Sequence, residues 1–141
     1  MESRYRLVVE DSPDPADLAL LEERVAEAAV AAAGAGDDQE FGIFVRDGDG
    51  VIVAGISGIV WAACCELQAM WVDDALQGRG LARMLMAEAE AEAKRRGCAV
   101  IAFHAYDLLA AGLYERLGYE TVGVVEGFPA GSAARWYRKT L

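Results

Sequence analysis

The chain has 141 residues, of which 55% are hydrophobic, and these values predict a single folded domain (residues 1–141) and exclude a disordered chain. Its formal net charge of −10 argues against a nucleic-acid partner, because such partners bind basic surfaces. The same charge slightly favours a cationic substrate or partner over an anionic one.

Neither a secretory signal nor a membrane span is expected. Residues 1–4 lead into no long apolar region, and the uncharged run 50–65 is shorter than the roughly 20 residues that cross a bilayer. Cys64, Cys65 and Cys98 lie in apolar runs without the spacing of metal ligands, which is typical of reduced, buried thiols. These features predict a cytoplasmic protein with no membrane partner and no metal.

The first forty or so residues predict a strand, a helix and a loop. Residues 5–10 are rich in strand-forming side chains. Asp14 followed by Pro15 is a typical start of a helix, and apolar residues three or four apart continue it to about Ala33. Residues 34–38 contain two glycines and predict a flexible loop.

Three strands should follow as an antiparallel meander, at Phe41–Arg46, Val51–Val60 and Cys64–Val72. The first two are joined by Asp-Gly-Asp-Gly, which favours a hairpin turn. A glycine-rich loop then precedes a helix at Leu81–Arg95. A loop between a strand and a helix N-terminus presents backbone N–H groups, and these favour a bound anion.

The C-terminal part predicts a strand, a short helix and two more strands. Cys98–Ala105 is apolar without alternation, as in a central strand, and the crossover rule makes it parallel to the strand before the loop. Leu108–Leu117 predicts the helix, and Tyr119–Val125 and Ala134–Thr140 predict the strands. The whole is an α/β (α+β) fold with a mixed, mostly antiparallel sheet of about six or seven strands, flanked by helices.

Two motifs together resemble those of the GNAT N-acetyltransferases. Residues 77–82, Gln-Gly-Arg-Gly-Leu-Ala, are similar to that family's Gln/Arg-x-x-Gly-x-Gly/Ala loop, and residues 110–119 are similar to its second signature. The order of elements also agrees over nearly the whole chain. A dinucleotide-binding loop is the competing interpretation, and it fits poorly because Arg83 stands where the third glycine would be.

The resemblance implies a site for acetyl-coenzyme A. In the family, the two parallel strands splay apart and the pantetheine arm pairs with exposed strand backbone in the gap. The pyrophosphate lies on the glycine loop, where Arg79 and Arg83 either add positive charge or are simply solvated. The residues expected to bind the cofactor are therefore Met70, Trp71, Val72, Gln77, Gly78, Arg79, Gly80, Leu81, Ala82 and Arg83.

Acetyl transfer to an amine requires a proton donor for the thiolate and a proton acceptor for the amine. Tyr114 matches the family's usual general acid, although a tyrosine there also suits the core. Glu66 is the candidate base, because a carboxylate within an apolar strand should resist ionisation; the alternative is a solvent-facing strand carboxylate. His104 and an ordered water are the other candidates. Asp107 replaces an asparagine often found in the family and is expected to cap the helix after it.

The resemblance implies an enzyme that moves acetyl from acetyl-coenzyme A to a primary amine, of a small molecule or a peptide, by direct transfer in a ternary complex. The alternative is a non-catalytic acyl-coenzyme A sensor or interaction module. The intact loop glycines and Tyr114 favour the enzyme. Trp61, Trp71 and Tyr106 either line an acceptor pocket or belong to the core. A homodimer that pairs through the final strand is a further expectation.

Overall fold

The computed structural model describes residues 4–36, 38–110 and 112–141, so residues 1–3, Asp37 of the predicted loop and Ala111 of the second motif lie outside the described residues. The chain divides into two units, residues 1–37 and 38–141, and each is described by itself. The single-domain organisation stays a prediction.

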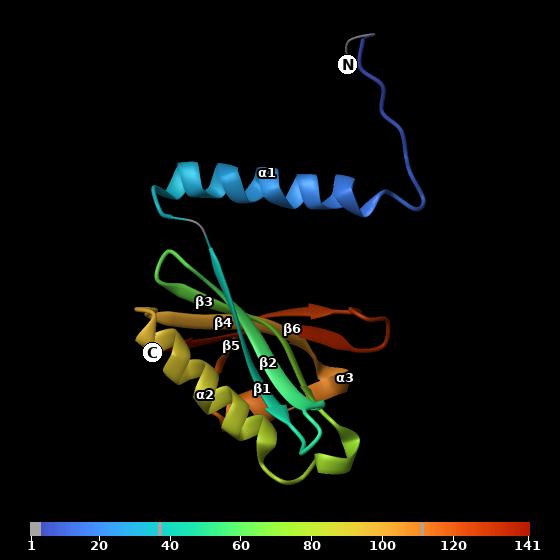
Figure 1. The fold of residues 1–141 in the computed structure, drawn as a ribbon. Helices are drawn as coiled ribbons and strands as arrows, with labels where there is room; N and C mark the ends of the chain where they lie inside the picture. Colours follow the sequence, from blue (N-terminus) through green and yellow to red (C-terminus); the bar gives the residue numbers. More distant parts are fainter. Residues whose placement is uncertain (1–3, 37, 111) are drawn as a thin grey trace. The chain divides into compact units, whose positions relative to one another are not determined.

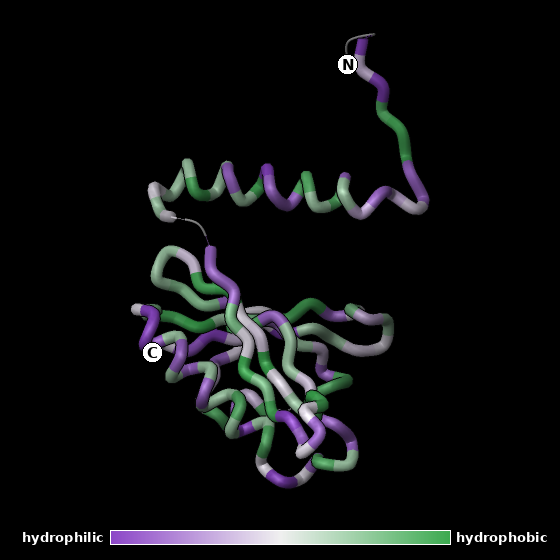
Figure 2. Tube along the Cα trace, in the orientation of Figure 1, coloured by the Kyte–Doolittle hydropathy of each residue, from purple (hydrophilic) through white to green (hydrophobic). Residues whose placement is uncertain are grey.

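The first unit contains one helix, α1 (Pro15–Ala33), as predicted. The carboxylate of Asp14 caps its N-terminus by accepting a hydrogen bond from the backbone N–H of Ala16 at 2.8 Å. Gly34 ends the helix with a φ of 66°. Hydrophobic and hydrophilic residues alternate along α1 (Figure 2). Its exposed apolar side chains include Leu18, Leu21 and Val25.

The strand predicted at residues 5–10 is wrong, because the described residues there form no strand. A strand exists only where a neighbouring strand accepts and donates its backbone hydrogen bonds. The sequence pattern reports which side chains suit a pleated surface, but it does not report whether a partner is present.

The second unit is built on one six-stranded sheet in the order β1-β2-β3-β4-β6-β5 (Figure 1). Every neighbouring pair is antiparallel except β3 and β4, which confirms the predicted mixed, mostly antiparallel sheet. The strands are β1 (Gln39–Arg46), β2 (Ile52–Trp61), β3 (Cys64–Val72), β4 (Val100–Tyr106), β5 (Glu120–Glu126) and β6 (Ala133–Thr140).

The final strand, β6, lies inside the sheet between β4 and β5. Both of its edges already carry ladder hydrogen bonds, to β4 on one side and β5 on the other. The expected pairing of this strand across a two-fold axis is therefore wrong, and the edges of the sheet belong to β1 and β5. Homodimerisation itself stays a prediction.

Helix α2 (Leu81–Arg95) packs on β1, β2 and β3 and covers one face of the sheet (Figure 1). Its apolar stripe buries Leu85, Met86, Ala89 and Ala93, and the two alanines let the helix approach the strands closely. A short 3-10 helix, η1 (Asp74–Leu76), precedes it. Among the described residues, no helix is long and apolar enough to cross a membrane.

Two short helices replace the single helix predicted at residues 108–117. They are α3 (Asp107–Ala110) and α4 (Leu113–Arg116). Gly112 precedes α4 with a φ of 77°, a left-handed conformation that cannot continue a right-handed helix. The second motif therefore spans a helix break, which places Tyr114 in the first turn of a new helix.

Candidate active site

The parallel strands β3 and β4 separate before either of them ends. Their pairing stops at Glu66 and Ala102, although β3 continues to Val72 and β4 to Tyr106. A bulge accounts for the separation: Leu67 and Ala69 face consecutive residues of β2, so Gln68 is an extra residue that bends β3. Beyond the bulge, β3 pairs with β2 alone, so one edge of its backbone is left for another partner.

A cleft of about 990 Å³ occupies this gap. It is bounded by the end of β3, the glycine loop, the end of β4 and the two short helices. Every residue expected to bind the cofactor lines it except Arg79, which lies outside. The other lining residues are Ala110, Leu113, Tyr114 and Arg116 of the second motif and, outside both motifs, Gln68, Ala69, Asp74, Leu76, His104, Ala105, Tyr106 and Leu109.

The glycine loop is held in the shape that an anion site needs. Gly78 and Gly80 have φ angles of 79° and 77°, which other residues adopt only under strain. No described side chain caps the N-terminus of α2, so the N–H groups of its first turn remain available to a ligand. The loop is tied to η1, because the side-chain amide of Gln77 donates to Asp74 at 3.2 Å.

Arginines surround this loop in a chain of strongly negative charge. Arg79, Arg83 and Arg116 form no ion pair within the described part of the chain. Arg83 and Arg116 line the cleft and also a second cavity of about 450 Å³ beside α2 and α4. Arg116 was missed by the sequence analysis, since a single cation on a short helix is usually solvated and gives no signal.

Tyr114, the predicted general acid, lies at the cleft in a buried position. The residue is only 7% exposed, and its ring meets Phe103 edge to face, with ring centres 4.6 Å apart. It lines the cleft and, with Gln68 and His104, a smaller cavity of about 50 Å³. Burial raises the pKa of the Tyr114 phenol, so the group stays protonated at neutral pH and can donate. Its catalytic role stays a prediction.

Glu66 is exposed on β3, so the solvent-facing alternative describes its position. Strand alternation causes this, since the buried Cys65 and Leu67 on either side of it point to the opposite face of the sheet. The carboxylate of Glu66 accepts a hydrogen bond from the amide of Gln68 at 3.1 Å. Gln68 lines the cleft and Glu66 does not. The role of Glu66 as a base stays a prediction.

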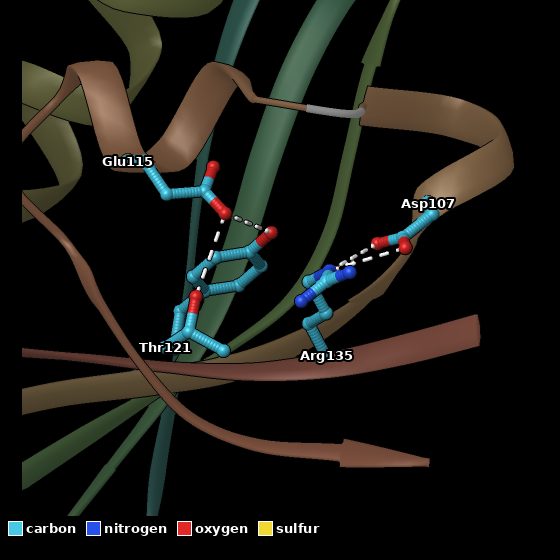
Figure 3. A network of polar contacts seen from close by, with 5 residues as sticks. Asp107, Glu115, Thr121 and Arg135 are labelled. Atoms are coloured by element: carbon cyan, nitrogen blue, oxygen red, sulfur yellow. Dashed lines mark hydrogen bonds and ion pairs between the residues drawn. The ribbon is translucent and has the colours of Figure 1, made fainter. Parts of the chain in front are cut away.

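Strand β6 holds both short helices in place through two polar contacts (Figure 3). The guanidinium of Arg135 donates to both carboxylate oxygens of Asp107, at 2.8 and 3.1 Å. The hydroxyl of Tyr137 donates to Glu115, the neighbour of Tyr114, at 3.2 Å. Burial and the negative charge of Glu115 raise the pKa of Tyr137 to about 12. The carboxylate of Asp107 thus links α3 to β6. Asp107 is the first residue of α3, and its side chain binds Arg135 in place of the predicted cap of the helix.

The cysteines differ in exposure, contrary to the expectation that all three are buried. Cys65 and Cys98 are buried, whereas Cys64 is exposed. Burial raises the pKa of Cys65 to about 11 and also raises that of Cys98. Within the described residues, no group of three or more His, Cys, Asp or Glu side chains could hold a metal ion.

We expect one of the three thiols to react rapidly with an aromatic disulfide reagent in the folded protein. Cys64 should supply it, because its sulfur is accessible while the other two are both buried and reluctant to form thiolates. Absorbance of the released thiol gives the number, and Cys64→Ser should abolish the fast phase. Two or three fast thiols in the wild type would contradict this assignment.

Comparison with known proteins gives a consistent picture. The family model described as Acetyltransferase (GNAT) family matches residues 3–119. Acetyltransferase Atu2258 of Agrobacterium fabrum (strain C58 / ATCC 33970) is 29% identical over 106 residues, which cover 75% of this chain and 77% of the relative. Blasticidin-S acetyltransferase of Streptomyces morookaense is 31% identical over 93 residues, covering 65% and 68% of the two chains.

Solved structures show the same fold. A crystal structure of an acetyltransferase from Agrobacterium tumefaciens has a TM-score of 0.89 at 26% identity, and the match covers 97% of this chain and all of the other. An aminoglycoside 6′-N-acetyltransferase complexed with coenzyme A has a TM-score of 0.61 at 21% identity, with 72% of each chain covered. At that identity the likeness concerns the fold alone.

Proposed function

Because the chain belongs to the GNAT acetyltransferase family, we propose that it transfers an acetyl group from acetyl-coenzyme A to a primary amine by direct transfer in a ternary complex. The observation that carries the proposal is the single cleft in which the glycine loop, the unpaired edge of β3 and Tyr114 meet. The reaction requires a site for the pyrophosphate, a partner for the pantetheine arm and a proton donor for the thiolate, and these three features would supply them in that order.

The residues present fit acetyl-coenzyme A. Met70, Trp71 and Val72 lie on β3 beyond its last pairing with β4, so their backbone can pair with an amide-bearing chain. The loop around Gly78 and Gly80 offers N–H groups to a pyrophosphate. Arg83 and Arg116 lie beside it in the cleft and its neighbouring cavity, where they would bind phosphate groups. When bound, the thioester supplies the acetyl group.

Two proton transfers would fall to side chains at the junction of β3 and β4. Tyr114 would donate to the leaving thiolate, because its buried phenol is neutral at working pH. His104 is the better placed acceptor, since it lines both the cleft and the small cavity with Tyr114. Glu66 lies outside the cleft and would position the side-chain amide of Gln68, which donates to its carboxylate; a role of Glu66 as a base would require a bridging water.

The acceptor is proposed to be a small molecule. The relative named blasticidin-S acetyltransferase and the aminoglycoside 6′-N-acetyltransferase of the same fold are both named for small-molecule antibiotics. The net charge of −10 agrees with an acceptor that arrives as a cation.

The proposal is tested by incubating the protein with acetyl-coenzyme A and a panel of amines, and measuring acetylated product by mass spectrometry. A mass readout is preferable to a free-thiol assay, because the exposed Cys64 would react with the thiol reagent. Acetylation of at least one amine, dependent on the protein, is expected. Tight binding of acetyl-coenzyme A without transfer to any amine would favour the non-catalytic alternative, and no binding would exclude both.

A further inference from the structure

The aromatic side chains of the C-terminal half divide into two sets. Phe103, Tyr114, Tyr119 and Tyr137 all belong to the buried hydrophobic core. His104, Tyr106, Phe128 and Trp136 do not, and we refer to these four as the aromatic shelf. Successive residues of β4 and β6 point to opposite faces of the sheet, so the shelf lies on the face away from the core.

The shelf is a continuous row of rings. The ring centres of Trp136 and His104 are 5.0 Å apart, those of His104 and Tyr106 5.8 Å, and those of Tyr106 and Phe128 6.0 Å. These are ordinary separations for interacting aromatic rings. Trp136 is nevertheless 40% exposed and Phe128 52% exposed, so much of this π surface still faces solvent.

The outer end of the shelf is fixed by backbone hydrogen bonds. Phe128 lies in the loop between β5 and β6, where the N–H of Gly127 donates to the carbonyl of Ser132 at 2.8 Å. The N–H of Ser132 in turn donates to the carbonyl of Pro129 at 2.9 Å. A row of rings set on two paired strands and a closed turn is preorganised, which lowers the entropic cost of binding.

The inner end of the shelf enters the candidate active site. His104 and Tyr106 line the same cleft as Tyr114, and Trp71 lines it from β3 with 53% of its surface exposed. A contiguous exposed aromatic patch favours aggregation unless it has a binding partner. A row of such rings that leads into the candidate cleft therefore indicates a binding surface. Gln68 lines the cleft with His104, and its amide nitrogen donates to Glu66, so the amide oxygen is the acceptor that Gln68 offers to an ammonium group.

We infer that the aromatic shelf is an acceptor subsite, and that the acceptor is a primary amine joined by a short linker to a planar aromatic or heteroaromatic ring. The ring would stack on Trp136, Tyr106 and the neighbouring shelf rings, while the amine enters the cleft toward Tyr114. The inference rests on the proposed acetyl transfer and narrows it, because aliphatic polyamines and aminoglycosides have no planar ring to stack.

Two amines that differ only in their ring provide the test: 2-phenylethylamine and 2-cyclohexylethylamine. Both carry a primary ammonium on a two-carbon linker and bury similar apolar area. The phenyl compound also has the lower amine pKa, which raises its rate in wild type and variant alike, so the change of the ratio on substitution measures stacking. We expect kcat/KM to be about 3- to 10-fold higher for the phenyl compound, as stacking beyond area burial predicts. Trp136→Leu, which keeps an apolar side chain, should lower this ratio severalfold.

Phe44→Leu is the matched control, because Phe44 is a 52% exposed aromatic residue on β1 that does not belong to the aromatic shelf. This variant should keep the wild-type ratio. The two amines are also compared by calorimetry on protein saturated with coenzyme A, which does not require turnover. Equal binding and equal rates, or better rates with polyamines or aminoglycosides, would overturn the inference. Ring-selective binding without any acetyl transfer would instead overturn the proposed function and leave the subsite standing.

Discussion

Tyr114→Phe should lower kcat by about 100-fold or more, the usual contribution of a general acid, while binding of acetyl-coenzyme A changes little. The substitution removes one oxygen and leaves the ring, so the packing against Phe103 at 4.6 Å is retained. What is lost is the only tyrosine hydroxyl that shares both the cleft and the small cavity with His104 among the described residues. Steady-state kinetics with a responsive amine, and calorimetry with coenzyme A, separate the two effects.

Tyr119→Phe is the matched control for this prediction. Tyr119 belongs to the same aromatic cluster, with its ring centre 5.2 Å from Phe103, but it lines neither the cleft nor the small cavity. Its hydroxyl donates to Glu90 at 2.8 Å, so its removal should cost about 1.5–3 kcal/mol of folding free energy and little activity. Equal kcat values for Tyr114→Phe and the wild type would remove Tyr114 from the mechanism.

The pH dependence of kcat gives a second test of the same residue. Burial raises the pKa of Tyr114 above the usual value of about 10, so the proton-donating form persists to higher pH than that of a free phenol. Ionisation of Tyr114 should therefore not lower the wild-type kcat below about pH 10. An alkaline decline below that pH which disappears in Tyr114→Phe would contradict this. A decline near neutral pH that persists in Tyr114→Phe would belong to another group.

Local patterns in the sequence were sufficient to predict much of the second unit. The glycine loop, the helix that begins at Leu81 and the parallel placement of β4 all follow from short-range signals and the handedness of crossovers. The gap between β3 and β4, and the residues expected to bind the cofactor in it, were implied by the family resemblance and not by local patterns. Nearly all of those residues line the cleft.

The features that could not be predicted depend on contacts between distant residues. The residue pattern of Ala133–Thr140 predicts a strand but does not indicate that β6 inserts between β4 and β5. Nothing near Gln68 signals a bulge, since a bulge is a mismatch between two strands and not a property of one. The pairing of Asp107 with Arg135 across 28 positions is of the same kind. Exposure of Glu66 was in principle readable, because its neighbours on the strand are both apolar.

Gly80→Ala should weaken binding of coenzyme A by roughly 5- to 30-fold and leave kcat at saturating acetyl-coenzyme A nearly unchanged. Gly80 has a φ of 77°, and an alanine held there is strained by about 1–2 kcal/mol. Apart from Gly80 itself and its two chain neighbours, no described residue has an atom within 4 Å of the position that the new Cβ would take, so the effect is conformational and not steric. If the loop relaxes to relieve the strain, its N–H groups leave the anion site, and binding must restore them.

Gly50→Ala separates that loss of affinity from a general loss of stability. Gly50 has a φ of 82°, is equally free of neighbours within 4 Å, and lies in the β1–β2 hairpin, outside the cleft. Gly50→Ala should lower the melting temperature by a few degrees, and Gly80→Ala by no more than that, because a loop that relaxes in the free protein has already relieved part of its strain. Only Gly80→Ala should weaken coenzyme A binding in calorimetry. Unchanged affinity in Gly80→Ala would mean that the pyrophosphate does not lie on this loop, whereas equal losses in both variants would trace the effect to the fold as a whole.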